Sequence, residues 1–395
     1  MMSNNNETIS VSAEIKQKAI MKPFDVYPLY DVTPVSAKGI VVTDDQGHEY
    51  LDFYGGHAVI SIGHSHPHYI KRLKDQLDRI GFYSNSIQNP LQVELAEKLG
   101  KLSDCEDYNL FLCNSGAEAN ENALKLASFQ TGKSQVIAFK NGFHGRTSAA
   151  VAATDNASIN APINKQQKVT FLSFNDVEAF QNEIEKGDVC AVIIETIQGV
   201  GGLDEPSTEF YQMVATQCKD HGALLIADEV QCGFGRSGKF FAYQHHGIKP
   251  DIITIAKGMG NGFPVGGVLI HESIKAVYGM LGTTFGGNHL ACAATIAVLE
   301  VIEKEQLLEN ATKLGERFEK MAAEIPQVQR VKGRGLMLGL EFNFEVADLR
   351  KRLIHNQHIF TGGAKDKKVL RFLPALNITE AHLDTFFKAL QKELS

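Results

Sequence analysis

Short apolar runs alternate with longer amphipathic stretches through the middle of this 395-residue chain. The apolar runs are residues 135–139, 189–194, 223–227 and 252–255, and the amphipathic stretches include 117–131 and 208–221. Apolar runs of this length are typical of strands that are buried on both faces of a sheet. Strands that alternate with helices predict an α/β fold with a mostly parallel, doubly wound sheet. Ligands of such sheets bind at the carboxyl ends of the strands.

The pattern changes near residue 290 and indicates a second, smaller unit. The later elements that we expect are helices at 292–305 and 309–325, a glycine-rich strand pair around 333–342, a strand at 369–372 and a helix from Thr379. Such a mixture is typical of an α+β domain. We therefore expect an N-terminal arm and part of the small domain at 1–60, a large ligand-binding domain at 61–290 and a C-terminal small domain at 291–395.

Charge and cysteine spacing exclude several classes of function. The net charge of −7 and the pI near 6.1 give no reason to expect nucleic acid or an anionic membrane as a partner, so a small-molecule substrate is favoured. The six cysteines stand singly, which predicts neither a metal site nor a disulfide framework and fits a reducing cytoplasm. Residues 1–22 are polar, so we interpret them as an arm or subunit contact rather than as a signal or membrane anchor.

The first candidate for chemistry is the segment 114–119, which follows an apolar run and opens a predicted helix. The start of a helix offers free N–H groups and the positive end of the helix dipole. Ser115, Gly116 and Ala117 could therefore hold a phosphate group. An ordinary serine-capped helix has the same sequence, so this motif does not decide between the two.

A second candidate is Asp228, which ends an apolar strand and is followed by Glu229. A carboxylate at the end of a strand can point into a ligand crevice and keep a pyridine nitrogen protonated, which makes the ring an electron sink. A solvated turn or a metal-binding aspartate would look the same, and the residues alone leave these alternatives open.

The third candidate is Lys257, which directly follows the apolar segment 252–256. A lysine amine at the end of a buried strand could form an imine with an aldehyde cofactor once it has lost its proton. The alternative is a lysine that extends to solvent. Gly258, Gly260 and Gly262 only weakly match a dinucleotide-binding fingerprint, because Phe263 stands where its last glycine belongs.

Taken together, the motifs make the chain resemble the class III aminotransferases of the fold-type I pyridoxal-phosphate group, and most of all the acetylornithine aminotransferases. The resemblance extends over about residues 28–394 and rests on segments 114–119, 143–147, 228–231, 233–238, 256–258 and 283–288. It implies the fold-type I architecture, pyridoxal 5'-phosphate as cofactor, no metal, and a homodimer with shared active sites.

The resemblance also implies roles for particular residues. Lys257 would form the imine with the cofactor and carry the proton, and Asp228 would pair with the pyridine nitrogen. Phe143 would stack on the ring, and Gln231 would lie near its phenolic oxygen. The other expected cofactor contacts are Ser115, Gly116, Ala117, Glu229, Val230 and, from the second subunit, Thr284.

Substrate contacts follow from the same resemblance. Arg146 and Arg371 would bind carboxylates, because a guanidinium group matches a carboxylate with two parallel hydrogen bonds. Thr283 would contact the substrate. In relatives of this family a glutamate occupies the position of Val200 and can mask the second arginine. We expect Arg371 to be unpaired and exposed here, which would favour a succinyl rather than an acetyl group on the substrate.

The function that we expect is transfer of the δ-amino group of an N-acylornithine to 2-oxoglutarate, or the reverse reaction with glutamate, in arginine biosynthesis. Ornithine aminotransferase and 4-aminobutyrate aminotransferase are alternatives with the same cofactor. An aminomutase of the same fold would need no amino acceptor. A nucleotide-binding protein without cofactor chemistry is the alternative from outside this group of enzymes, and it would show no absorbance from a lysine imine.

Overall fold

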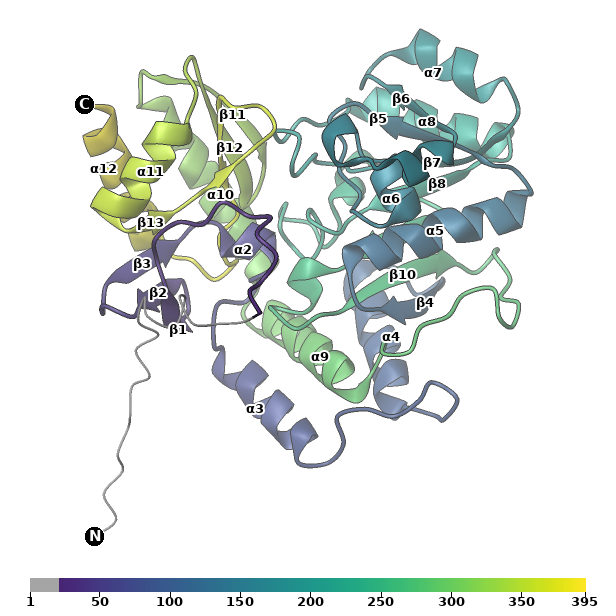
Figure 1. The fold of residues 1–395 in the computed structure, drawn as a ribbon, viewed down its shortest axis with the longest axis horizontal. Helices are drawn as coiled ribbons and strands as arrows, with labels where there is room; N and C mark the ends of the chain where they lie inside the picture. Colours follow the sequence, from purple (N-terminus) through teal and green to yellow (C-terminus); the bar gives the residue numbers. More distant parts are fainter. Residues whose placement is uncertain (1–20) are drawn as a thin grey trace.

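The computed structural model describes residues 21–395, so the predicted arm at 1–22 lies outside the described residues except for its last two. Three sheets organise the described chain, one of seven strands and two of four strands. Figure 1 places the seven-stranded sheet and its helices on one side of the molecule and the last helices of the chain on the other. This arrangement agrees with the α/β architecture that the alternating pattern predicts.

The large sheet consists, in spatial order, of β4 (Tyr108–Cys113), β10 (Gly266–His271), β9 (Ile252–Ile255), β8 (Leu224–Asp228), β7 (Val189–Ile194), β5 (Gln135–Phe139) and β6 (Val169–Leu172). The strands from β9 to β6 pair in parallel. Only β10 runs antiparallel to its neighbours within this sheet. The mostly parallel sheet is therefore confirmed, although the predicted apolar runs include neither β6 nor β10.

Side chains alternate between the two faces of this sheet. On β7, Ala191 and Ile193 belong to a cluster with the helix α5 (Gly116–Thr131). Val192 and Ile194 belong to the main cluster, which includes the helix α8 (Thr208–Asp220). Both faces are covered, which explains why this strand is apolar throughout. The other short elements around this sheet are α6 (Ser148–Ala152), α7 (Val177–Ile184), η1 (Ala157–Ile159), η2 (Pro162–Gln166), η3 (Ala242–His246) and η4 (Lys257–Met259).

The two small sheets combine both ends of the described chain. The first contains β1 (Pro34–Lys38), β2 (Val41–Asp44), β3 (Glu49–Asp52) and β13 (Ile359–Phe360), and the second contains β11 (Val328–Arg334), β12 (Met337–Phe342), β15 (Val369–Phe372) and β14 (Gly362–Gly363). Because β13 pairs with β3, an early segment is joined to the C-terminal part, as Figure 1 shows. This pairing supports our proposal that part of residues 1–60 belongs to the small domain, and the boundaries at 60 and 290 remain proposals.

Longer helices pack around and between the sheets. They are α3 (Pro67–Leu77), α4 (Pro90–Ser103), α9 (His289–Lys304), α10 (Leu307–Ala323), α11 (Ala347–Gln357) and α12 (Glu380–Leu394), with the four-residue turn α2 (Gly55–Ala58) before them. Within residues 21–395, no helix combines the length and apolarity that crossing a bilayer requires. The same residues contain no group of three side chains placed to bind a metal ion, and all six cysteines are free.

Candidate active site

A cavity of about 450 Å³ lies where the carboxyl ends of β7, β8 and β9 meet the start of α5. It brings together nine of the residues that the sequence singled out: Ser115, Gly116, Ala117, Phe143, Arg146, Asp228, Val230, Gln231 and Lys257. These residues come from segments far apart in the chain. They meet because parallel strands present their carboxyl ends at one edge of the sheet.

The start of α5 forms one wall of the cavity. Ser115 caps this helix, and its hydroxyl accepts a hydrogen bond from Glu118 N at 3.2 Å. The next N–H groups, those of Gly116 and Ala117, belong to the first helical turn and have no acceptor within the helix. A Cβ on Gly116 would lie 2.5 Å from Val230 Cγ1, so only glycine fits beside that side chain. The wall thus offers free N–H donors and the positive end of the helix dipole to an anion.

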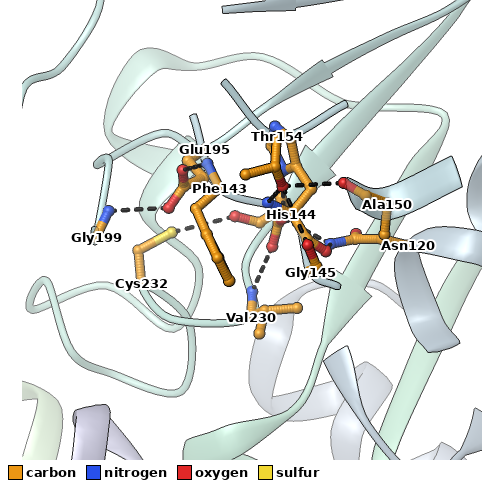
Figure 2. A network of polar contacts seen from close by, with 11 residues as sticks. Asn120, Phe143, His144, Gly145, Ala150, Thr154, Glu195, Gly199, Val230 and Cys232 are labelled. Atoms are coloured by element: carbon orange, nitrogen blue, oxygen red, sulfur yellow. Dashed lines mark hydrogen bonds and ion pairs between the residues drawn. The ribbon is translucent and has the colours of Figure 1, made fainter. Parts of the chain in front are cut away.

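Asp228 is held by donors from three parts of the chain. Its Oδ2 accepts a hydrogen bond from Asn120 Nδ2 at 2.8 Å and lies 2.7 Å from His144 Nδ1, while its Oδ1 accepts from Val230 N at 3.1 Å. The side chain is only 3% exposed. Figure 2 shows these contacts around His144, with Asn120 on one side of it. The donors stabilise a negative charge at the end of β8.

His144 is as buried as the aspartate that it contacts. Burial alone lowers the pKa of an imidazole, but the hydrogen bond and the charge of Asp228 outweigh it and raise the pKa of His144 above its ordinary value. Neither His144 nor Asn120 has a predicted role. His144 directly follows Phe143 in segment 143–147 and Asn120 lies one helical turn after Gly116, but neither position indicates a contact with Asp228.

Lys257 stands on the turn η4, directly after β9 and Ala256. Its backbone φ is 48°, a left-handed conformation that is costly for a residue with a Cβ. Burial lowers the pKa of the Lys257 ammonium, and nearby positive charge from Arg371 adds to this, although Asp228 and Glu195 oppose it. A lowered pKa increases the fraction of neutral amine, which is the form that attacks a carbonyl carbon.

Glu195 hydrogen-bonds two loops of the cavity, the one that carries Phe143 and the one that carries Gly199. Its two carboxylate oxygens accept hydrogen bonds from Phe143 N at 2.8 Å and from Gly199 N at 2.9 Å. Burial raises the pKa of Glu195 to about 7. The contact fixes the backbone that carries the Phe143 ring, which lines the cavity.

Four predicted residues do not line the cavity of their own chain: Glu229, Thr283, Thr284 and Arg371. Glu229 is fully buried and accepts hydrogen bonds from Ala242 N and Tyr243 N, both at 2.9 Å, so it braces the loop after β8. Thr283 Oγ1 accepts a hydrogen bond from Gly286 N at 3.0 Å. Thr284 is exposed.

Arg371 corrects one expectation about the substrate site. No carboxylate lies within ion-pair distance of it among residues 21–395, as the presence of Val200 in the cavity wall predicts. The guanidinium is nevertheless only 4% exposed, so the expectation of an exposed group is wrong. It donates instead to the carbonyl oxygens of Gly199 and Gly363. A buried guanidinium must find acceptors for its donors, and here backbone carbonyls provide them.

Comparison with known proteins decides the family. The sequence matches the family described as aminotransferase class-III over residues 25–394. The chain belongs to the class III aminotransferases. It is 42% identical to the acetylornithine aminotransferase of Bacillus subtilis, with 94% of this chain and 97% of that protein covered.

Two further relatives of this aminotransferase show the range of the similarity. It is 37% identical to the [LysW]-aminoadipate semialdehyde/glutamate semialdehyde transaminase of Sulfolobus acidocaldarius, with 95% of this chain and 97% of that protein covered. The crystal structure of the ornithine aminotransferase of Toxoplasma gondii superposes with a TM-score of 0.87 at 27% identity, with 96% of this chain and 93% of that chain covered.

The cavity of this class III aminotransferase fits pyridoxal phosphate, the cofactor of the family. Gly116 leaves space beside Val230 that a larger residue would fill, next to free N–H groups suited to a phosphate. Asp228 offers a buried, strongly hydrogen-bonded carboxylate for a ring nitrogen. Lys257 offers an amine with a lowered pKa for the aldehyde. Each chemical group of the cofactor therefore has a complementary residue.

Proposed function

We propose that this protein is an N-acylornithine aminotransferase, which transfers the δ-amino group of an N-acylornithine to 2-oxoglutarate or runs the reverse reaction with glutamate. One observation carries the proposal: Lys257, Asp228 and the start of α5 line one cavity in a chain whose relatives include acetylornithine aminotransferases. A place in arginine biosynthesis and a cytoplasmic location follow from the same proposal.

The bound cofactor supplies an electron sink that stabilises negative charge on the carbon next to the transferred nitrogen. Lys257 would carry the proton to and from that carbon, and its lowered pKa favours the neutral amine that accepts it. Asp228 holds a proton on the ring nitrogen, while His144 and Asn120 keep its carboxylate in place.

The remaining contacts position the cofactor. Ser115, Gly116 and Ala117 hold the phosphate, and Phe143 and Val230 line the cavity around the ring. Gln231, which also lines the cavity, would hydrogen-bond the ring oxygen. Thr284 is exposed on its own chain, so we propose that it completes the phosphate site of a second copy in a homodimer.

Two arginines, Arg146 and Arg371, would bind the carboxylates of the substrates. Arg146 is exposed at the cavity, where its guanidinium can bind the α-carboxylate of the entering amino acid. Arg371 provides the second carboxylate site when glutamate is bound. Thr283 Oγ1 accepts a hydrogen bond from Asn114 Nδ2 at 3.5 Å, and we propose that Thr283 contacts the substrate.

Of the two acyl groups, acetyl and succinyl, we propose succinyl, because the buried Arg371 has only neutral oxygen acceptors and no carboxylate partner in the described chain. A succinyl group brings its own negative charge to that arginine. We expect the catalytic efficiency for N-succinylornithine to exceed that for N-acetylornithine by about tenfold or more, since about 1.4 kcal/mol of ion pairing is enough for this factor. Steady-state kinetics with 2-oxoglutarate as acceptor measures both values.

Replacing Val200 by glutamate tests the physical reason for this preference. The new carboxylate pairs with Arg371, so we expect the preference for the succinyl compound to fall by about tenfold in Val200→Glu. Val200→Gln is the matched control, because it has the same size without the charge and is expected to change the ratio little. A wild-type enzyme that prefers the acetyl compound, or free ornithine or 4-aminobutyrate, contradicts this substrate assignment.

A further inference from the structure

Residues 53–63, which we call the bridging segment, lie between Arg371 and the turn that carries Lys257. At one end, the Tyr54 ring lies 6.0 Å from the Arg371 guanidinium carbon, and Phe53 O accepts a hydrogen bond from Leu373 N at 2.8 Å. At the other end, Ser61 Oγ donates to Gly258 O at 2.6 Å. Gly258 directly follows Lys257, so one short segment contacts both Arg371 and the residue after Lys257.

Asn261 hydrogen-bonds the bridging segment. It lies two residues after η4 (Lys257–Met259), and we call residues 257–261 the lysine turn. Its Oδ1 accepts hydrogen bonds from Ser61 N at 2.9 Å and Ile62 N at 3.1 Å, and its Nδ2 donates to Gly63 O at 3.0 Å. The side chain is only 6% exposed. All three contacts are with backbone groups about 200 positions away in the sequence, so this one amide fixes the relative position of two loops.

Several residues with a strained backbone lie where the bridging segment meets the lysine turn. His57, Ala58, Lys257 and Asn261 all have a left-handed backbone, with φ of 68°, 64°, 48° and 46°. This conformation is unfavourable for residues with a Cβ, asparagine least of all, and it persists only where surrounding contacts determine it. The hydrogen bonds of Ser61 and Asn261 are side-chain contacts between the lysine turn and the bridging segment. Strain of this kind is typical of functional sites.

We propose that Asn261 is a positioning residue that clamps the lysine turn onto the bridging segment and so fixes the Lys257 amine relative to Arg371. The inference rests on the proposed role of Lys257 as the lysine that binds the cofactor. Loosening the clamp lets the strained turn relax and moves the amine away from the carbon with which it exchanges a proton. The side chains that bind the substrate carboxylates are left unchanged.

The test uses Asn261→Gly, because glycine keeps the left-handed backbone and removes only the amide. We expect its kcat to fall by about tenfold or more while KM for glutamate changes less than about threefold, since small displacements at a reacting group have large rate effects. We also expect a shift in the pH at which the visible absorbance of the bound cofactor titrates. Ser61→Ala, which removes only the bond to Gly258, is expected to shift both quantities in the same direction.

Asn175→Gly is the matched control. Asn175 also has a left-handed backbone, with φ of 65°, and its Oδ1 accepts a hydrogen bond from Ser207 N at 2.9 Å, but it is exposed and far in the sequence from both Lys257 and the bridging segment. Its kcat and spectral titration are expected to equal those of the unmodified enzyme.

Two results would overturn the inference. In the first, Asn261→Gly and Ser61→Ala keep the kcat and the spectral titration of the unmodified enzyme. In the second, kcat falls only in proportion to the folded, cofactor-loaded fraction and the titration does not shift, which makes the contacts merely structural. An unmodified protein that shows no cofactor absorbance at all contradicts the proposed function instead, so the two failures are distinguishable.

Discussion

Lys257→Ala is expected to reduce transamination between an N-acylornithine and 2-oxoglutarate by about 10³-fold or more, because general acid–base catalysis by one side chain contributes up to about 10⁴-fold. Lys257 is the lysine that lines the cavity, and its pKa is lowered by burial. Alanine removes the only side chain that we assign to proton transfer. Initial rates at saturating substrate, for protein incubated with pyridoxal phosphate, measure the effect.

Lys168→Ala is the control for this prediction. The Lys168 side chain is 67% exposed and pairs with Asp188 on the surface, so its loss is expected to leave the rate unchanged. Circular dichroism of both variants shows whether they are folded. A folded Lys257→Ala protein that keeps more than about a tenth of the wild-type rate contradicts the role of this lysine in proton transfer.

Asp228→Asn is expected to lower kcat by about 10²-fold or more, since the loss of one preorganised electrostatic contact costs about 10²–10³-fold in comparable sites. Asparagine has nearly the same shape but lacks the charge that keeps a ring nitrogen protonated. Asp188→Asn is the matched control, because the Asp188 side chain is 47% exposed and lies outside the cavity. A kcat in Asp228→Asn within about threefold of the wild type excludes the role that we assign to this carboxylate.

The same substitution has a pH-dependent effect on stability. The folded-state pKa of His144 is raised, so its ion pair with Asp228 contributes stability at pH values below the ordinary histidine pKa, and that stability is lost as pH rises through the folded-state value. We therefore expect Asp228→Asn to destabilise the cofactor-free protein more at about pH 6 than at about pH 8. Denaturant unfolding at both pH values measures this difference, and an equal loss at both contradicts it.

The strands that could be predicted are those that form continuous apolar runs in the sequence. The runs at 135–139, 189–194 and 252–255 coincide with β5, β7 and β9, because these strands are buried on both faces. The strand β10 was not predicted, because it begins with Gly266 and Gly267 and glycine disfavours strands. These glycines are required by packing, since a Cβ on Gly266 would lie 2.7 Å from Ser115 O. Such a close approach involves residues distant in sequence and leaves no local pattern.

Some residues of the candidate site could also be predicted from local patterns, and others could not. Lys257, Asp228 and the start of α5 could be predicted, because each directly follows a recognisable apolar run. Their supporting residues could not, because Asn120, His144 and Asn261 act through contacts with partners about 84 to 200 positions away. The burial of Arg371 was also missed, since the carbonyl oxygens that it contacts are provided by loop geometry and not by a sequence motif.

Borohydride reduction after incubation with pyridoxal phosphate tests the central claim most directly, because it converts an imine between the aldehyde and a lysine into a stable bond. Peptide mapping by mass spectrometry then locates the attached pyridoxyl group. We expect a single modified lysine, Lys257, in the peptide that follows β9, and no attachment there in Lys257→Ala. A protein that stays colourless with the cofactor and carries no pyridoxyl group on Lys257 after reduction would contradict the account.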